Sequence, residues 1–257
     1  MPKFGLIVPC SLLPFGLGLS VLIVLVLEWL APDVIPFELG TFWAVRQPFW
    51  TAFGDSIVQS WPVLAAGVLM TLIFLPAKRQ QQRHLALYGA PEGRVVTLGP
   101  GAVLFNSALE EVVFRWLLFY AAIAGAVAMD YIVLGFAELH PVRWFFTELL
   151  IPAADWATAG RLHEVLTAGP WTVAAAMLTS NGRFRNGHAY QGLLGFAWSW
   201  YMGMFLFLIM FEHGLPLAIA VHVAYNLVIL AVHLAIVGTM PRLLLLERPP
   251  LPYEGEE

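Results

Sequence analysis

Charged residues are scarce in this sequence, and their scarcity excludes most water-soluble folds. Asp, Glu, Lys and Arg make up only 12% of the 257 residues, whereas 60% of the residues are hydrophobic. A soluble domain usually carries about 25% charged residues, because polar side chains have to cover much of its surface. The abundance of large apolar residues also excludes an intrinsically disordered chain. We therefore expect an integral membrane protein.

Lysine and cysteine are almost absent. The chain has only two lysines, Lys3 and Lys78, and its formal net charge is −4. It therefore offers no basic surface that could neutralise a phosphate backbone, and we expect no nucleic-acid partner. The single cysteine, Cys10, excludes a disulfide bond within the chain.

Long apolar runs take the place of the missing charges. A transmembrane helix needs about 20 mostly apolar residues. Runs without Asp, Glu, Lys or Arg occupy residues 4–27, 56–77, 186–211 and 213–241. A further run, 95–129, is interrupted by three charges, 165–182 is short and contains Pro170, and 131–153 is broken by polar residues. The fold class predicted from these runs is all-α, a polytopic transmembrane helix bundle with about six spans and at most eight.

The charged loops orient this predicted bundle. The first apolar segment lacks the cleavage pattern of a signal peptide, so we expect it to remain as a membrane anchor. The loop after it is mainly acidic, whereas the next loop carries four basic residues between positions 78 and 94. The positive-inside rule places that basic loop in the cytoplasm, and six spans then leave both termini cytoplasmic. The predicted parts are two N-terminal spans with the basic loop (1–94), a transmembrane core (95–241) and an acidic, proline-containing cytoplasmic tail (242–257).

Helix geometry separates the three charges that interrupt the run 95–129. A charge at the bilayer centre costs about 2.5–3.5 kcal/mol on insertion scales, so each one needs a partner. Glu111 and Arg115 are four residues apart on one helix face, and we expect them to form an ion pair in which Glu111 is mainly structural. Glu110 points about 100° away and shares its face with Asn106 and Phe114. Two interpretations of Glu110 follow: it helps Glu111 to hold Arg115 in a buried ionic cluster, or it is the carboxylate that is available for chemistry.

The same four-residue spacing occurs twice more. His222 and Asn226 place an imidazole and a carboxamide on one helix face, where both can donate hydrogen bonds to one point. Phe184 precedes His188 by four residues at the edge of a predicted span. The other histidines of these spans are interpreted as ordinary core residues, because a lone histidine in an apolar helix is usually one.

Together these elements resemble the three motifs of the CPBP family of intramembrane proteases. This family includes the type II CAAX prenyl endopeptidases and many prokaryotic Abi-type membrane proteins. The resemblance covers about residues 100–237 and depends on Glu110-Glu111-x-x-x-Arg115, Phe184-x-x-x-His188 and His222-x-x-x-Asn226. One departure is that Arg183 and Arg185 flank Phe184, whereas the family has this motif within an apolar helix. The Asn-Gly-His segment is similar to prokaryotic members that resemble sorting enzymes for C-terminal tags.

The resemblance implies an enzyme, a glutamic-type intramembrane endopeptidase in a prokaryotic cell membrane. Its substrate would be a membrane-anchored or lipidated protein, cut at an active site in an intramembrane cavity without a metal or other cofactor. In the family, the first glutamate and the histidine of the second motif activate a water, and the third motif stabilises the oxyanion. The corresponding catalytic residues are Glu110, His188, His222 and Asn226. The supporting residues are Glu111, Arg115, Asn106 and Phe184.

Three other hypotheses are compatible with the same residues. Glu110, His188 and His222 form a set that can bind catalytic zinc, which would give a zinc-dependent version of the protease. Intramembrane Glu, His and Arg also form proton relays, as in a proton-coupled transporter or a membrane binding protein. A protease-like fold could finally bind a partner without cutting it. The expected partners are the lipid bilayer and a membrane-anchored protein or peptide.

Overall fold

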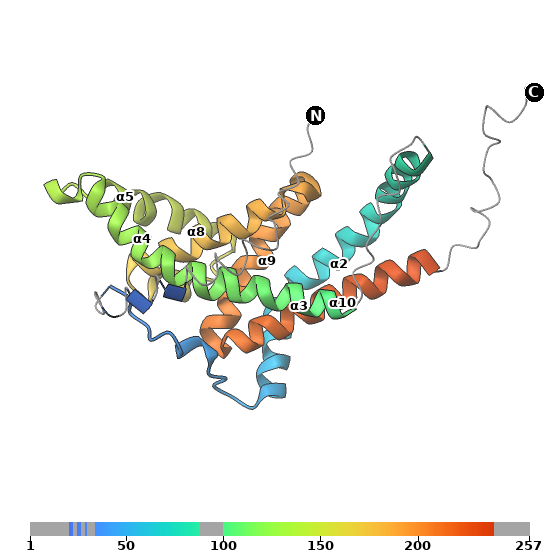
Figure 1. Ribbon diagram of the computed structural model, residues 1–257, viewed down its shortest axis with the longest axis horizontal. Coiled ribbons are helices and arrows are strands. Elements are labelled where there is room, and N and C mark those ends of the chain that lie inside the picture. The colour runs from blue at the N-terminus through green and yellow to red at the C-terminus, as the bar shows by residue number, and fades with distance from the viewer. Residues whose placement is uncertain (1–20, 23–24, 27–28, 30–33, 88–99, 239–257) are drawn as a thin grey trace, which may run out of the picture.

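The computed structural model describes residues 21–22, 25–26, 29, 34–87 and 100–238, and most of these residues lie in helices (Figure 1). None of these residues forms a strand, so the predicted all-α class is confirmed for them. The helices are α2 (Phe49–Leu87), α3 (Pro100–Glu111), α4 (Leu118–Ile132), α5 (Pro141–Phe145), α6 (Ile151–Ala157), α7 (His163–Thr167), α8 (Trp171–Gly187), α9 (Gly192–His213) and α10 (Leu215–Gly238). Short 3-10 or π turns are η1 (Thr41–Trp43), η2 (Val112–Leu117), η3 (Gly135–Ala137), η4 (Phe146–Leu150) and η5 (Ala189–Gln191).

Four helical segments are long and apolar enough to cross a membrane. They are Phe49–Phe74, Val103–Ile132, Gly192–His213 and Leu215–Val232. These candidate segments overlap the predicted spans 56–77, 95–129, 186–211 and 213–241, although their bounds differ. The predicted span 4–27 lies almost entirely outside the described residues, and the predicted tail 242–257 lies wholly outside them. The described residues therefore give four candidate spans rather than the six to eight that were predicted.

The second span is one continuous helical segment made of α3, η2 and α4. Pro100 is its first residue, a position where the missing N–H of proline costs nothing because it would have no partner within the helix. The π-helical turn η2 begins directly after Glu110 and Glu111. Such widened turns are rare inside α-helices and occur often at functional sites.

Helices α3 and α10 pack in opposite directions. Ser107 contacts Asn226, and one turn further along α3 Glu111 contacts His222, which lies one turn earlier on α10. Helix α10 in turn forms a hairpin with α9 around Gly214. Gly214 has φ +104°, and a Cβ there would lie 2.5 Å from a backbone oxygen of the segment before α2, so only glycine fits this turn. As a result, α3 and α9 run in the same direction on either side of α10.

Helix α8 packs against both α4 and α9. Near the middle of α8, the Ser180 hydroxyl donates to the backbone oxygen of Phe114 in η2. At the N-terminal end of α8, Trp171 lines a cavity together with Asp130, near the end of α4. Helix α8 therefore runs antiparallel to α4. It overlaps the short predicted segment 165–182, but it begins and ends further along the chain.

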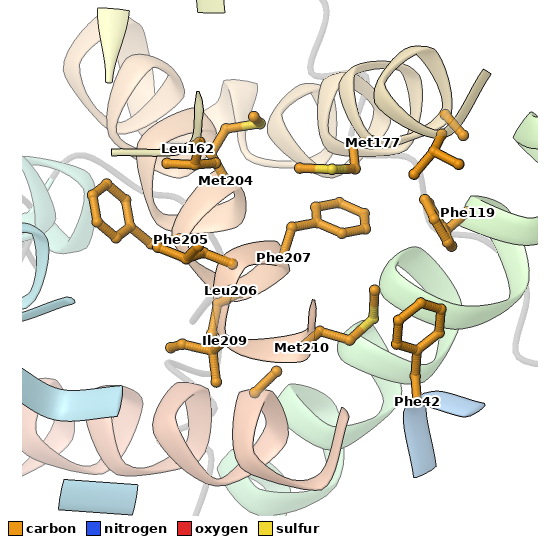
Figure 2. Packing of buried hydrophobic residues seen from close by; sticks show 14 of the residues in the cluster. Phe42, Phe119, Leu162, Met177, Met204, Phe205, Leu206, Phe207, Ile209 and Met210 are labelled. Carbon is orange, nitrogen blue, oxygen red and sulfur yellow. The ribbon is translucent and has the colours of Figure 1, made fainter. Parts of the chain in front are cut away.

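The segment before α2 fixes the α3–α4 helix beside α9. The indole of Trp116 donates to the backbone oxygen of Leu39 at 2.9 Å, and the Tyr120 hydroxyl donates to that of Glu38 at 2.7 Å. Phe42 is buried nearby against aromatic rings of α4 and α9. Figure 2 shows Phe42 and Phe119 at one side of a core that continues through the phenylalanine, leucine and methionine side chains of α9. This packing holds the helices that carry the predicted site residues.

Candidate active site

Most of the predicted site residues meet where α3, η2, α8 and α10 pack together. The two glutamates end α3, and the π turn that follows carries Arg115. Helix α10 supplies His222 and Asn226, and the C-terminal end of α8 supplies Phe184 and His188. The three sequence motifs therefore converge in space, although the contact between Glu111 of the first motif and His222 of the third joins residues 111 positions apart.

Glu111 is the centre of this cluster. Its side chain is 0% exposed, and one oxygen, Oε1, lies 2.7 Å from Nδ1 of His222 and 3.3 Å from Nη1 of Arg115. The ion pair expected between Glu111 and Arg115 is thus present, and the contact with His222 is additional. Because the carboxylate oxygen accepts this hydrogen bond, Nδ1 of His222 carries the hydrogen, which fixes the orientation of the ring.

Glu110 has a different environment from its neighbour. Its side chain is 35% exposed, and its Oε2 lies 3.8 Å from Nε2 of His222. This distance is too long for a hydrogen bond. The two ring nitrogens of His222 therefore face two adjacent glutamates, one sealed in the interior and one open. The divergence of the glutamates follows from the helical rotation of about 100° per residue.

Arg115 is fully buried between Glu111 and two aromatic rings. Its Cζ lies 3.9 Å above the ring of Phe184 and 5.6 Å from that of Phe207. The face of an aromatic ring attracts a cation, and the attraction is strongest where water is excluded. No guanidinium nitrogen of Arg115 makes a hydrogen bond to any residue that the structure describes. The charge of Glu111 and the two rings together are therefore the stabilising partners of this arginine.

Phe184 links the second motif to the other two. Its ring centroid lies 4.5 Å from that of His188 and 6.1 Å from that of His222. Its backbone oxygen lies 2.8 Å from Nδ1 of His188 and accepts a hydrogen bond from it. The flanking arginines do not enter this cluster, because Arg183 is exposed and Arg185 packs over Phe196 at 4.3 Å.

Ser107 is a member of the cluster that the sequence analysis missed. Its side chain is buried, and its hydroxyl oxygen accepts a hydrogen bond of 2.8 Å from Nδ2 of Asn226. The predicted supporting residue Asn106 is exposed and makes no hydrogen bond with the described residues. The sequence could have indicated Ser107, because it lies four residues before Glu111 and eight before Arg115 on the same helix face. Asn106 was predicted instead because it shares a face with Glu110.

No family model, curated protein or solved structure matches this chain. The interpretation of the site therefore depends on its own geometry and chemistry.

Two further observations concern the intramembrane cavity that the resemblance implies and the zinc hypothesis. A cavity of about 300 Å³ lies beside Asp130 and His140, at the far end of α4, and not at Glu110. Within residues 34–87 and 100–238, no group of three or more His, Cys, Asp or Glu side chains is arranged to hold a metal ion. Glu110, His188 and His222 are thus not gathered as a set of ligands.

Replacing Ser107 by Ala is expected to lower the stability of the protein. The variant would leave the half-buried amide of Asn226 without its acceptor, and an unpaired polar group costs about 1–3 kcal/mol when it is fully buried and less when it is half-buried. Ser107→Thr keeps a hydroxyl and should recover part of the loss. Ser60→Ala is the control, because the Ser60 hydroxyl bonds only to the backbone of its own helix. The measurement is thermal unfolding of both variants in one detergent. Equal falls in melting temperature for Ser107→Ala and Ser60→Ala would contradict a special role for the Ser107 hydroxyl.

Proposed function

We propose that the chain is an intramembrane endopeptidase of the type that the CPBP resemblance implies. The observation that carries this proposal is the position of His222 between the sealed carboxylate of Glu111 and the open carboxylate of Glu110. A helix bundle needs no such arrangement for packing, because one buried arginine requires only one good carboxylate. The second glutamate is left for chemistry.

Glu110 and His188 activate the attacking water in this proposal. The water oxygen adds to the carbonyl carbon of the substrate as its proton passes to Glu110, and the proton then moves to the leaving amine as the C–N bond breaks. His188 donates its Nδ1–H to the backbone oxygen of Phe184. In this tautomer of the neutral ring, Nε2 is the acceptor nitrogen.

Asn226 and His222 stabilise the oxyanion that forms in this step. The side-chain amide of Asn226 has two N–H donors, and Ser107 accepts only one of them. His222 already donates through Nδ1 to Glu111, so its Nε2 can donate only when the ring is protonated. The proposal therefore requires His222 as an imidazolium, with its positive charge between the carboxylates of Glu110 and Glu111.

The depth of the site favours a membrane-anchored substrate. His222 and Asn226 follow Leu215 by about two and three helical turns, which places them roughly 10–17 Å along the span Leu215–Val232. Only a segment within or close to the bilayer reaches that depth. We further propose that α8 and segment 4–27 add two crossings to the four candidate spans, which gives six spans with both termini in the cytoplasm of a prokaryotic cell.

A comparison of membrane proteomes tests the proposed activity. Cells that carry Glu110→Gln should accumulate at least one membrane protein with an uncut terminus that cells with the native chain process. Glu164→Gln is a matched control, because it makes the same chemical change at an exposed glutamate of α7. Proteomes without any such difference would contradict a peptidase function.

His222→Ala and Asn226→Ala are each expected to reduce turnover by about 10²–10³ with little change in KM, because oxyanion donors act mainly in the transition state. His222→Gln should retain more activity than His222→Ala, since an amide can donate a hydrogen bond. The measurement is steady-state cleavage of the substrate found in the proteome. A variant that raises KM and keeps kcat would show that the residue binds substrate instead.

A further inference from the structure

A second cluster of ionisable side chains lies at the far end of α4. Asp130 is buried there, and both of its carboxylate oxygens accept hydrogen bonds from the segment that follows α4. Its Oδ2 lies 2.7 Å from Nδ1 of His140, and its Oδ1 accepts from the backbone N–H of Arg143 at 2.9 Å. Figure 1 shows α5, which includes Arg143, beside this end of α4. Asp130 thus ties the end of one helix to the start of another.

The backbone between these residues is held in an unfavourable conformation. Leu134, Glu138 and His140 have φ values of 64°, 62° and 44°, in the left-handed region that residues with a Cβ rarely adopt. Non-glycine residues of this kind cost about 1–3 kcal/mol each and concentrate at functional sites. The contacts of Asp130 compensate for this cost by fixing both His140 and Arg143. The His140 ring and the backbone at Arg143 are therefore held in place at the end of α4.

The cavity of about 300 Å³ opens at this cluster. Its polar part is formed by Asp130, His140, Arg143 and Thr172, and its apolar part largely by Val127, Tyr131 and Trp171. Its size is at the lower end of the range of about 300–1,000 Å³ that is typical of ligand sites. It lies at the end of the span Val103–Ile132, where tyrosine and tryptophan commonly mark the membrane surface. The cavity therefore faces the region of lipid headgroups.

Arg143 supplies the charge that selects a ligand. Its guanidinium makes no hydrogen bond or ion pair with any residue in the part of the chain that the structure describes. The nearby carboxylate of Asp130 does not neutralise it by contact, because both carboxylate oxygens already accept from His140 and from the backbone. A planar guanidinium beside an apolar wall suits a phosphate that is attached to an apolar group.

We propose that this cavity, the α4–α5 cavity, binds the phosphate of a membrane phospholipid, with Arg143 as its ion-pair partner and His140 as a hydrogen-bonding neighbour. The lipid is favoured over free phosphate because the apolar wall would contact its glycerol and acyl groups. The site is distinct from the cluster around Glu110 and does not depend on the proposed cleavage activity.

Lipid titration of the full chain in detergent, followed by native mass spectrometry, tests this site. The probes are phosphatidylglycerol, diacylglycerol with the same acyl chains, and inorganic phosphate. We expect phosphatidylglycerol to bind the unaltered protein better than diacylglycerol does, and Arg143→Gln to weaken its binding about tenfold or more. Arg143→Lys should have an intermediate effect. The control is Arg161→Gln, because Arg161 is exposed in the same connecting region and donates only to a backbone oxygen of α2.

Each outcome decides the proposal. The Arg143→Gln protein should remain folded, because Asp130 contacts the backbone of Arg143 and not its side chain. Equal phosphatidylglycerol binding by Arg143→Gln and the unaltered chain would overturn the site. Diacylglycerol that binds as tightly as phosphatidylglycerol would overturn phosphate recognition. Displacement of the lipid by inorganic phosphate would support the phosphate site and show that soluble anions enter it, whereas a lack of displacement would support the lipid as the ligand.

Discussion

Glu110→Gln should abolish cleavage and leave the protein folded, whereas Glu111→Gln should unfold it. Among the described residues, the open carboxylate of Glu110 lies within 4 Å of one ionisable side chain, His222, whose Nε2 is 3.8 Å away, so a neutral amide can replace it with little loss of stability. Glu111 is sealed and holds both Arg115 and His222. Removing its charge strands a buried arginine, and breaking a buried pair in this way typically costs about 3–5 kcal/mol.

The two glutamates serve as controls for each other, because they are adjacent and the substitution is the same. Thermal unfolding and cleavage are measured for both variants in one detergent. A Glu110→Gln protein that still cuts its substrate would remove Glu110 from the mechanism. A Glu111→Gln protein that is as stable as the unaltered chain would show that Arg115 finds sufficient partners elsewhere.

Gly203→Ala is expected to destabilise the protein strongly, although it adds only one carbon atom. A Cβ at position 203 would overlap Oδ1 of Asn181 and lie 2.7 Å from Nη2 of Arg115. Asn181 cannot move away freely, since its Nδ2 donates to the backbone oxygen of Trp200 at 2.8 Å. Either the arginine leaves Glu111 or the helices separate, and we expect a loss of about 3–5 kcal/mol, the cost of breaking a buried ion pair.

Gly125→Ala provides the matched control for Gly203→Ala. Gly125 also lies inside a helix, but a Cβ there would meet nothing within 4 Å. Alanine favours a helix over glycine by about 1 kcal/mol, so this variant should be neutral or slightly more stable. Thermal unfolding of both variants distinguishes steric exclusion from a general effect of glycine. Equal melting temperatures would contradict the requirement for glycine at position 203.

Helical periodicity predicted contacts within one helix and failed to predict those between helices. The spacing of Glu111 and Arg115 was sufficient to predict their ion pair, because residues four apart always share a face. The contact of Glu111 with His222 depends on which helices are neighbours and on their register, which a single sequence does not contain. Ser107 was missed for a related reason: a serine in a helix commonly bonds to its own backbone, so its presence indicates no partner.

The four spans were predictable because their apolar runs are long, whereas α8 was placed wrongly because its sequence is mixed. The residues next to α8 mark its ends: Pro170 immediately precedes its first residue, and His188 immediately follows its last. Apolar content predicts helices that contact lipid. Helix α8 instead contacts protein over most of its length, and its buried side chains include Ser180 and Asn181.

The polar side chains of α8 also constrain the order in which the chain assembles during synthesis. Asn181 depends on the backbone of Trp200, which belongs to α9 and leaves the ribosome after α8. Until α9 emerges, the amide of Asn181 has no protein partner in this part of the fold, and an unsatisfied polar group in hydrocarbon costs several kcal/mol. In the six-span arrangement proposed above, α8 would therefore wait at the membrane surface and enter the bilayer together with α9. A chain released from the ribosome before residue 192 would keep α8 outside the hydrocarbon layer, exposed to proteases.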